Sequence, residues 1–391
     1  MWPSETNAKT GMSRVFVRGG AASAVQRSFD PSRTLDDAIS CILDGVVSSG
    51  LSMSTIDGMV VGNMLGPRIL NQQQIAALLA NELGYEGPSV TVDAACGSGG
   101  AALLLGNTMV RSGQYRNVLV VGYEHMRHPN SDLVTQALAG ASHWEHEGSR
   151  GETFVTLNGG LMGRYKRFHT HSDFASFALN AHTHASTNEL ALFRTPSTRT
   201  EYANSKSIHP HLRLMDASAV CNGSAAVVLS SEGILGQDVL ITGSAGATDA
   251  LHLKRRDEPL HIRAAEASTK EALRMSGLQH DAIDVLEPHD AYTVMGALSL
   301  ESSGFVPSGQ TPLYAEYGEF GCLGSRPCST FGGLLRRGHP VGASGVYQAY
   351  EALQQLRGTA PTENRVPHAA RAWIQSIGGA GTSVYTHILE L

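Results

Sequence analysis

Short runs of β-branched and apolar residues alternate with longer amphipathic stretches along most of the chain. The apolar runs expected to form strands cover residues 58–61, 89–93, 117–121, 225–230, 239–243, 282–286, 372–377 and 383–390. The stretches of helical length include residues 36–49, 75–83 and 346–356. Such alternation is typical of layered α/β proteins rather than of β-sandwiches or helical bundles. We therefore predict an α/β fold with a mixed sheet.

Two segments depart from this alternation. Residues 1–11 are polar and are predicted to form an N-terminal extension, because a valine-containing strand and a glycine turn follow Met12. This strand argues against a mitochondrial transit peptide, although the segment contains Arg and Ser. Residues 125–211 are rich in His, Ser, Thr, Asn and Arg, with one helix expected at 174–185. A strand-poor segment of this length is typical of an inserted cap over a functional site.

A weak internal repeat relates two distant parts of the chain. Residues 94–106 (AACGSGGAALLLG) and 338–350 (GHPVGASGVYQAY) each place a reactive side chain before a glycine-containing helix start. Two halves with one reactive residue each predict a duplicated fold whose site lies between them. We expect the halves to cover residues 12–245, which include the insertion, and residues 246–391.

Composition and charge narrow the classes of function. The chain of 391 residues is 42% hydrophobic and 16% charged, which is enough apolar sequence for a sizeable core. A net charge of −6 and the lack of basic runs argue against binding of nucleic acid. No apolar run reaches the roughly 18 residues needed to span a membrane. We therefore expect small-molecule chemistry.

The number and spacing of the cysteines argue against a disulfide framework. The five cysteines are an odd number without CxxC spacing, which favours a reducing compartment. We expect the cytoplasm, with the mitochondrion as the alternative.

The glycine-rich stretches lack both the lysine of a phosphate loop and the GxGxxG spacing. A histidine-rich patch has paired residues that diverge on a helix and no Cys or carboxylate cluster to complete a zinc site. It contains His169, His171, His182 and His184.

Cys96 is the leading candidate nucleophile. It lies between a predicted strand and a helix start, where unpaired backbone N–H groups and the helix dipole stabilise a thiolate. Its neighbours are small, which would let a substrate carbonyl reach the sulfur and let those N–H groups act as an oxyanion hole. The alternative is a buried cysteine that only fills core space.

Three further elements carry candidate chemistry. His339, between a glycine and a proline beside a second helix start, could carry the proton of a thiol, or be a loop histidine without a role. His289 follows the apolar run 282–286 and could donate a hydrogen bond to a carbonyl oxygen; the alternative is a helix cap involving Asp290. The stretch SIGGAGTS (376–383) could aim a backbone N–H at an oxyanion, or be a plain hairpin.

Taken in this order, these elements resemble the thiolase superfamily, specifically its sterol-carrier-protein-type and archaeal acetoacetyl-CoA thiolase branch. The resemblance covers about residues 12–391. It includes stretches similar to family motifs, namely GYEHM (122–126) to GxExM, NAHTHASTNELA (180–191) to KNHxNAxxNPxA, NGSAAVVLSS (222–231) to DGAAAVVLxS, and the family's histidine helix at 338–358.

The resemblance implies a thiolase fold, a duplicated five-layered αβαβα arrangement with an inserted loop domain, and subunits paired as homodimers or higher oligomers. Cys96 would take the acyl group from CoA, His339 would activate it, and His289 would hold the thioester oxygen of a second acyl unit. The backbone N–H groups of Cys96 and Gly378 would form the oxyanion hole. A CoA thioester is the expected substrate, lying across the inserted region, with no bound cofactor or metal. A small CoA-presenting partner protein accompanies some relatives.

Two positions depart from the family pattern. Ser376 stands where the family has the acid/base cysteine of its CxG motif, and Ala291 stands where it has the cysteine of HDCF. A serine hydroxyl cannot replace a thiolate as base without strong activation, because its pKa is far above neutrality. Tyr292, in place of the family phenylalanine, and Tyr347, near His339 in sequence, are further candidates for proton transfer.

These departures leave three hypotheses. The leading one is an acyl-CoA-dependent acyltransferase that carries out Claisen condensation or thiolysis through a Cys96 acyl-enzyme. The second is a retro-aldolase or CoA-independent C-acyltransferase with a tyrosine as base. The third is a degenerate thiolase that binds acyl-CoA or acts as a scaffold.

Overall fold

The computed structural model of the chain describes residues 14–391, and the extension expected at residues 1–11 lies outside them. The strands are β1 (Phe16–Ala22), β2 (Gly58–Gly62), β3 (Ser89–Val92), β4 (Asn117–Glu124), β5 (Ser207–His209), β6 (Leu212–Arg213), β7 (Gly223–Ser230), β8 (Leu240–Thr248), β9 (Val285–Glu287), β10 (Arg371–Gly378) and β11 (Ser383–Glu390). The helices are α1 (Pro31–Ser48), α2 (Ile75–Leu83), α3 (Ser98–Arg111), α4 (Ser131–Ala139), α5 (Phe154–Phe168), α6 (Ala175–Ser186), α7 (Arg199–Asn204), α8 (Arg263–Ser276), α9 (Thr293–Ser302), α10 (Thr311–Glu316) and α11 (Ser344–Leu356).

The main sheet is mixed, as predicted, and runs through both halves of the chain. Its strand order is β3-β2-β4-β7-β1-β8-β11-β10-β9. The half-sheet from β3 to β1 belongs to the N-terminal half, and the half-sheet from β8 to β9 forms the C-terminal one. Because β8 begins at Leu240, the C-terminal half-sheet starts a few residues before the expected boundary at residue 245. The two half-sheets join where Phe16 pairs with Leu240 and the N–H of Val17 donates to the carbonyl of Val239 over 2.7 Å.

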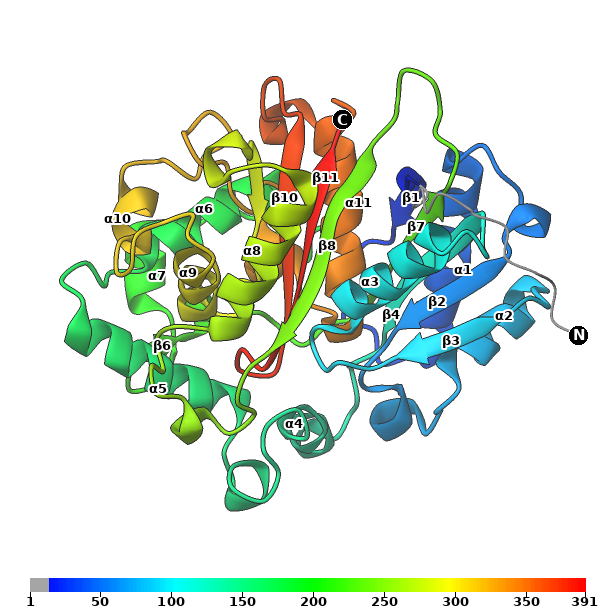
Figure 1. Cartoon of the computed structure of the whole chain (residues 1–391). Coiled ribbons are helices and arrows are strands. Elements are labelled where there is room, and N and C mark those ends of the chain that lie inside the picture. Colours follow the sequence, from blue (N-terminus) through cyan, green and yellow to red (C-terminus); the bar gives the residue numbers. More distant parts are fainter. Residues whose placement is uncertain (1–13) are drawn as a thin grey trace, which may run out of the picture.

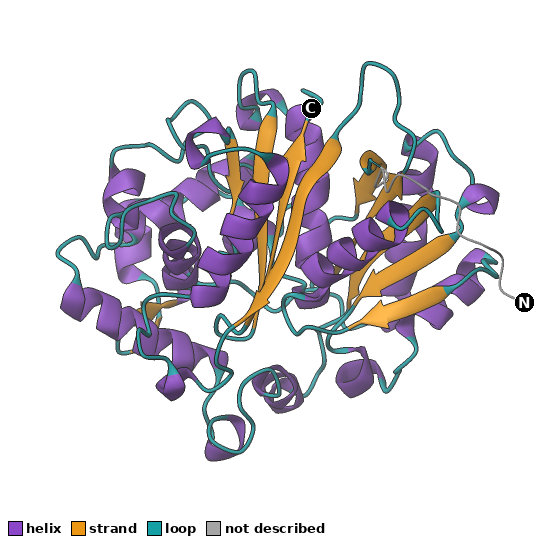
Figure 2. Ribbon diagram, in the orientation of Figure 1, coloured by secondary structure: helices purple, strands orange, loops and turns teal. Residues whose placement is uncertain are grey.

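Two helices lie between the half-sheets. Helix α3 contacts β2 and β4 of its own half and also β8, β10 and β11, whereas α11 contacts β10 of its own half and also β1 and β7. Helices α1 and α2 cover the outer face of the N-terminal half-sheet, and α8 covers that of the C-terminal one (Figure 1, Figure 2). This confirms the predicted order of helix, sheet, helix, sheet and helix layers.

The innermost strands are covered on both faces. Every residue of β7 is buried, and so is every residue of β4 after Asn117. Strands buried on both faces need near-continuous apolar sequence rather than alternation. The runs VLVVGY in β4 and AAVVL in β7 meet this requirement, which explains why they were recognisable as strands.

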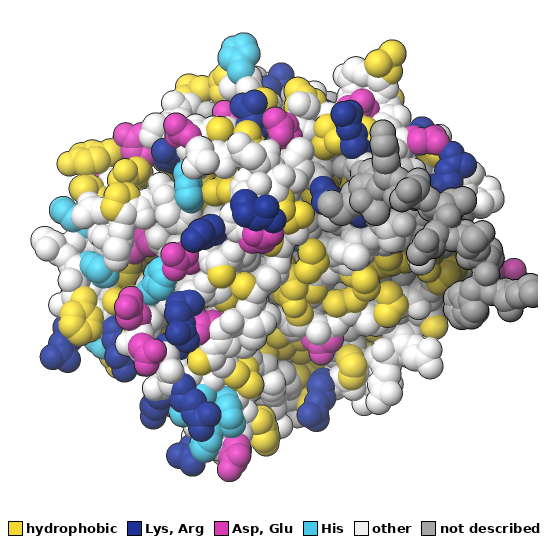
Figure 3. All heavy atoms as spheres, in the orientation of Figure 1, with side chains coloured by type: hydrophobic (Ala, Val, Ile, Leu, Met, Phe, Trp, Pro, Cys, Tyr) yellow, Lys and Arg dark blue, Asp and Glu magenta, His cyan; other side chains and the backbone are white. Residues whose placement is uncertain are grey.

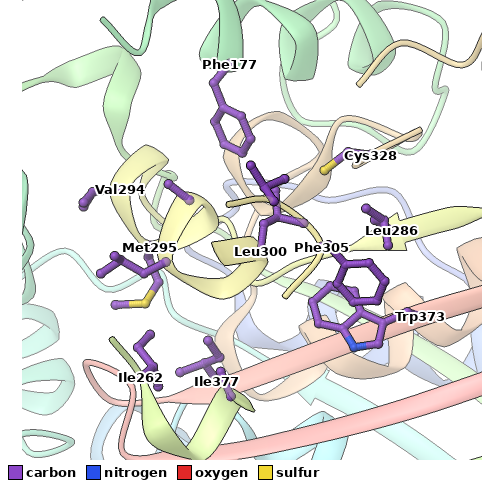
Figure 4. Packing of buried hydrophobic residues seen from close by; sticks show 14 of the residues in the cluster. Phe177, Ile262, Leu286, Val294, Met295, Leu300, Phe305, Cys328, Trp373 and Ile377 are labelled. Carbon is purple, nitrogen blue, oxygen red and sulfur yellow. The ribbon is translucent and has the colours of Figure 1, made fainter. Parts of the chain in front are cut away.

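One hydrophobic cluster joins the C-terminal half to the inserted region. Trp373 on β10 packs against Phe305 with ring centroids 4.8 Å apart, and Phe177 on α6 packs edge-on against Phe320 at 5.7 Å. Figure 4 shows Phe177 at one end of this cluster and Ile377 at the other. The segment expected as an insertion contains α4 to α7 and most of the β5–β6 ribbon, and its helix α6 is anchored in this core.

Local predictions agree with the structure where short-range signals are strong. Helix α2 and strand β11 cover the expected residues, and the glycine stretch 378–383 turns between β10 and β11. Strand β9 is shorter than expected, because residues His280–Ala282 form a 3₁₀ turn and take up the start of the apolar run. Among residues 14–391, no helix combines the length and hydropathy needed to cross a bilayer.

Candidate active site

Cys96 lies in a tight turn between β3 and α3. Ala95 has a left-handed backbone (φ 55°), which is unfavourable for a non-glycine residue and typical of functional turns. The carboxylate of Asp93 accepts from the N–H of Ala95 over 2.8 Å, and the hydroxyl of Ser98 accepts from the N–H of Ala94 over 2.9 Å. These bonds hold Cys96 just before the helix, as predicted.

The small residues after Cys96 serve close packing rather than substrate access. A Cβ at Gly97 would lie 3.0 Å from the nitrogen of Gly378, and one at Gly99 would lie 2.8 Å from the nitrogen of Gly345. A Cβ at Gly345 would in turn lie 2.4 Å from the nitrogen of Gly100. The expectation that these positions open a path to the sulfur is therefore wrong. They let α3, α11 and β10 approach one another, which brings the two halves of the site together.

His339 presents an unprotonated nitrogen to the site. Its Nδ1 lies 2.7 Å from the hydroxyl of Ser344, and that hydroxyl donates to the carbonyl of Pro340 over 3.0 Å. Because the hydroxyl proton is used on the carbonyl, Nδ1 must carry the proton in its own bond to Ser344. The buried Nε2 then carries a lone pair and no proton, and it has no hydrogen-bond partner within residues 14–391.

His289 has the opposite tautomer. The backbone N–H of Ile377 donates to its Nδ1 over 3.2 Å, so the ring proton lies on Nε2. The rings of His289 and His339 have centroids 5.1 Å apart and stand at 85° to each other. Burial lowers the pKa of His289 to about 3 and lowers that of His339 well below its usual range. Both imidazoles are therefore neutral in the free site.

A cavity of about 90 Å³, partly open to solvent, brings these groups together. Cys96 comes from the N-terminal half and both histidines from the C-terminal half. Apolar side chains form much of the remaining wall, as is usual for small-molecule sites. The polar wall residues include Cys96, His289, His339, Asn158, Ser218 and Tyr292, and the apolar ones include Met126, Leu138, Phe154, Ala291, Met295 and Val341.

Burial, rather than the helix dipole, dominates the pKa of Cys96. Desolvation and the charge of Glu124 raise it to about 12, although the N–H groups of Cys96 itself and of Gly379 act in the opposite direction. Burial thus opposes the stabilisation of a thiolate that the helix dipole led us to expect. The thiol is neutral until a base takes its proton.

The glycine turn brings a further amide, that of Gly379, to the cavity. Gly379 lines the cavity and its N–H faces the sulfur of Cys96. Gly378, the predicted donor, directly precedes it, and a Cβ on Gly378 would meet the carbonyl oxygen of Ala94 at 2.2 Å. The N–H groups of Cys96 and of the Gly378–Gly379 turn are the candidates to receive an oxyanion.

Two of the predicted acid/base residues do not line this cavity. Ser376 packs against the helix starts at Gly100 and Gly345, because its position on β10 directs the side chain into the middle layer. Tyr347 donates to the carbonyl of Ser23 over 2.9 Å and lies in the core between α11 and β7. Tyr292 does line the cavity, so it is the remaining phenol beside the histidines.

Glu124 is a buried residue of the site region to which the sequence analysis assigned no role. Its carboxylate accepts from the backbone N–H groups of Met64 at 2.9 Å, Leu65 at 3.0 Å and Gly342 at 2.9 Å. It thereby ties the end of β4 to the loop that carries His339. Burial raises its pKa to about 7. Its position at the carboxyl end of an apolar strand was the available sequence signal.

The histidine-rich patch is dispersed in the structure. His182 accepts from Arg336, and His184 bonds through Nδ1 to the carbonyl of Ser329 at 3.1 Å. In the described part of the chain, no group of three or more His, Cys, Asp or Glu side chains is arranged to hold a metal ion.

Comparison with known proteins agrees with this architecture. Residues 19–195 match the model of the thiolase N-terminal domain, and residues 245–391 match that of the thiolase C-terminal domain-like family. A solved structure described as the Ltp2-ChsH2(DUF35) aldolase has the same fold, with a TM-score of 0.82 at 21% identity, covering 96% of this chain and 97% of that one.

Sequence relatives lie in the branch that the motifs resemble. The acetyl-CoA acetyltransferase of Methanothermobacter thermautotrophicus is 34% identical over 89% of this chain and 92% of its own length. That of Methanocaldococcus jannaschii is 31% identical over 88% and 91%, and human sterol carrier protein 2 is 26% identical over 95% and 71%. The chain therefore belongs to the thiolase family.

Proposed function

We propose that the protein is a thiolase-like acyltransferase in which Cys96 takes an acyl group from an acyl-CoA thioester. The acyl group then passes to a carbon nucleophile or, in the reverse direction, to CoA. The observation that carries this proposal is the cavity in which Cys96, His289 and His339 meet, with one imidazole offering a lone pair and the other a proton.

The first step follows from the tautomer of His339. Its Nε2 takes the proton of the Cys96 thiol as the sulfur attacks the thioester carbon, and this avoids a free buried thiolate. The oxyanion that forms accepts from the N–H groups of Cys96 and of the Gly378–Gly379 turn. CoA then leaves as its thiol after receiving the proton from His339. General base catalysis of this kind contributes about 10²- to 10⁴-fold, and one oxyanion-hole donor about 10²- to 10³-fold.

The second step needs a group that binds the incoming acyl unit and a base for its α-carbon. The Nε2–H of His289 can donate to the thioester oxygen of that unit and stabilise the enolate. Ser376 faces the middle helix layer, and burial keeps the phenol of Tyr292 protonated, so the group left to remove the proton is His339, whose Nε2 is free again after CoA departs. We assign this role to His339. The enolate carbon then attacks the acyl carbon, the bond from that carbon to the Cys96 sulfur breaks, and the protonated His339 returns its proton to the leaving thiolate.

Retro-aldol or CoA-independent acyl transfer is the second candidate function. The observation that favours it is Tyr292, which lines the cavity beside Cys96 while burial raises the pKa of its phenol. With a raised pKa the phenol stays neutral, so it would act as a hydrogen-bond or proton donor to a substrate oxygen rather than as the base expected from the sequence. This function requires Tyr292 for turnover and does not require a Cys96 acyl-enzyme.

We propose that the enzyme works as a homodimer paired through the edge of the sheet. Strand β3 is the terminal strand of the N-terminal half-sheet, and Val90 on it is 42% exposed. Figure 3 shows hydrophobic side chains gathered over α3 and the strands beside it. An uncovered edge of this kind readily pairs with a second copy. We also expect that a small CoA-presenting partner takes part, and the free cysteines fit the reducing cytoplasm.

Thiolysis of acetoacetyl-CoA tests the proposed function. We expect CoA-dependent loss of the substrate's absorbance with the native protein, and a loss of at least about 10³-fold in kcat with Cys96→Ala. Full activity of Cys96→Ala, or turnover that requires Tyr292 but not Cys96, would replace the acyltransferase with the second candidate. Tight binding of the CoA ester by the native protein without any turnover would point to a binding or scaffold role.

A further inference from the structure

Asn158 is a buried polar residue in the wall of the same cavity. It lies on α5, in the inserted region, and its side chain belongs to a residue that is only 1% exposed. Phe154, Leu138 and Met295 line the cavity with it, so its amide is set among apolar side chains. No step of the proposed acyl transfer uses this amide.

The orientation of the amide follows from its one hydrogen bond. Nδ2 donates to the carbonyl of Phe154, one turn earlier on α5, over 2.9 Å. A carbonyl oxygen only accepts, so the nitrogen must face Phe154 and Oδ1 must face the other way. Oδ1 is buried and accepts no hydrogen bond from any residue between 14 and 391. A buried acceptor without a donor is destabilising, which makes an unpaired amide in a cavity wall a mark of ligand binding.

Most other polar groups of the cavity are committed to the reacting atoms, and the hydroxyls of Ser218 and Tyr292 can donate as well as accept. The N–H groups of Cys96 and of the Gly378–Gly379 turn and the Nε2–H of His289 are donors for oxygens, and the lone pair of His339 is needed for the thiol proton. Asn158 adds a neutral acceptor outside this set. It matches a substrate that carries a hydrogen-bond donor near its thioester.

We propose that Oδ1 of Asn158 accepts a hydrogen bond from an O–H or N–H group of the substrate and selects substrates that carry one. This inference rests on the proposed function, since it assumes that a thioester occupies the cavity. The donor has two sources with the same chemistry. One is a hydroxyl on the acyl chain, and the other is the amide N–H next to the cysteamine part of CoA.

Two pairs of esters separate these sources. Butanoyl-CoA and 3-hydroxybutanoyl-CoA differ by the acyl hydroxyl. The S-butanoyl esters of N-acetylcysteamine and of N-acetyl-N-methylcysteamine differ by the amide N–H. Binding is measured by calorimetry in a Cys96→Ala background, where no acyl transfer interferes, and acyl-enzyme formation is measured separately with native Cys96.

Asn158→Leu is the test variant because leucine has a similar volume and no acceptor. Asn107→Leu is the matched control, since Asn107 is another buried asparagine with an unpaired Oδ1 but does not line the cavity. We expect the donor-bearing ester of one pair to bind about tenfold more tightly than its partner. Asn158→Leu should bring that ratio close to one, and Asn107→Leu should leave it unchanged.

Each other outcome counts against the inference. Equal binding within both pairs, or an unchanged ratio in Asn158→Leu, overturns it even if Cys96 is acylated. Acylation that fails with every ester removes the proposed function, whereas the binding ratio still decides the role of Asn158. Absence of binding by all four esters overturns both.

Discussion

The imidazole rings of His289 and His339 lie 5.1 Å apart, centroid to centroid, and hold their protons on opposite nitrogens. Ile377 donates to Nδ1 of His289, whereas Nδ1 of His339 donates to Ser344. One ring therefore presents a proton and the other a lone pair to the same cavity. The pair can bind an oxygen and take a proton in one step without starting from a charged ring.

Replacing His339 with alanine removes the base that takes the Cys96 proton. We expect the rate of acyl-enzyme formation to fall by about 10²- to 10⁴-fold, because the neutral buried thiol cannot otherwise ionise. Rapid-quench mass spectrometry measures this rate. His280→Ala is the control, since that partly buried imidazole does not line the cavity. Acylation at the native rate in His339→Ala would exclude this residue as the base.

Alkylation of Cys96 should report the raised pKa of its thiol. Because burial raises the pKa to about 12, the thiolate fraction increases with pH throughout the neutral range. Iodoacetamide labelling of the Cys96 peptide should therefore rise about tenfold per pH unit from pH 7 to pH 9. A rate that levels off below pH 8 would instead indicate a thiolate paired with a protonated imidazole.

Gly342 should tolerate no side chain. A Cβ there would lie 2.5 Å from Oε2 of Glu124 and 2.7 Å from the Cα of Asn63. We expect Gly342→Ala to lower the free energy of unfolding by about 1 to 3 kcal/mol and to reduce acylation by displacing the loop of His339. Gly160→Ala on α5 is the matched control. Nothing lies within 4 Å of its Cβ, so alanine should be neutral or slightly stabilising. Equal melting temperatures for the two variants would contradict the role of this contact.

The two tyrosines should give opposite results when changed to phenylalanine. Tyr347→Phe loses the bond to the carbonyl of Ser23 and should cost about 1 kcal/mol of stability with turnover retained. Tyr292→Phe should fold normally and keep acyl transfer within a few-fold, because His339 is the base in the proposed mechanism. A loss of more than about 10²-fold in kcat for Tyr292→Phe would favour the tyrosine-dependent alternative.

The features that could be predicted from the sequence are those set by short-range patterns of residues. Apolar runs and glycine turns located α2, β11 and the β10–β11 hairpin, and the position of Cys96 before a helix start was recognisable from its neighbours. His289 and His339 could be named as candidate site residues only because their order along the chain resembles that of the thiolase superfamily.

The predictions that differ from the structure concern side chains whose surroundings are set by tertiary packing. Tyr347 was a candidate for proton transfer because it is close to His339 in sequence. On α11, however, its side chain points into the core and does not line the cavity. The helix dipole led us to expect a stabilised thiolate at Cys96, whereas burial between the two halves raises the pKa of its thiol. Asn158 lines the cavity because α5 packs against α9 of the C-terminal half. None of these relationships is encoded in the spacing of residues within one element.

Acetylation of Cys96 tests the central claim most directly. The native protein is incubated with acetyl-CoA and its intact mass is measured, followed by mapping of the modified peptide. We predict a gain of one acetyl group on Cys96 that is absent from Cys96→Ala, forms slowly in His339→Ala and disappears when CoA is added. No adduct with acetyl-CoA or longer acyl-CoA esters, or an adduct on another residue, would contradict the account.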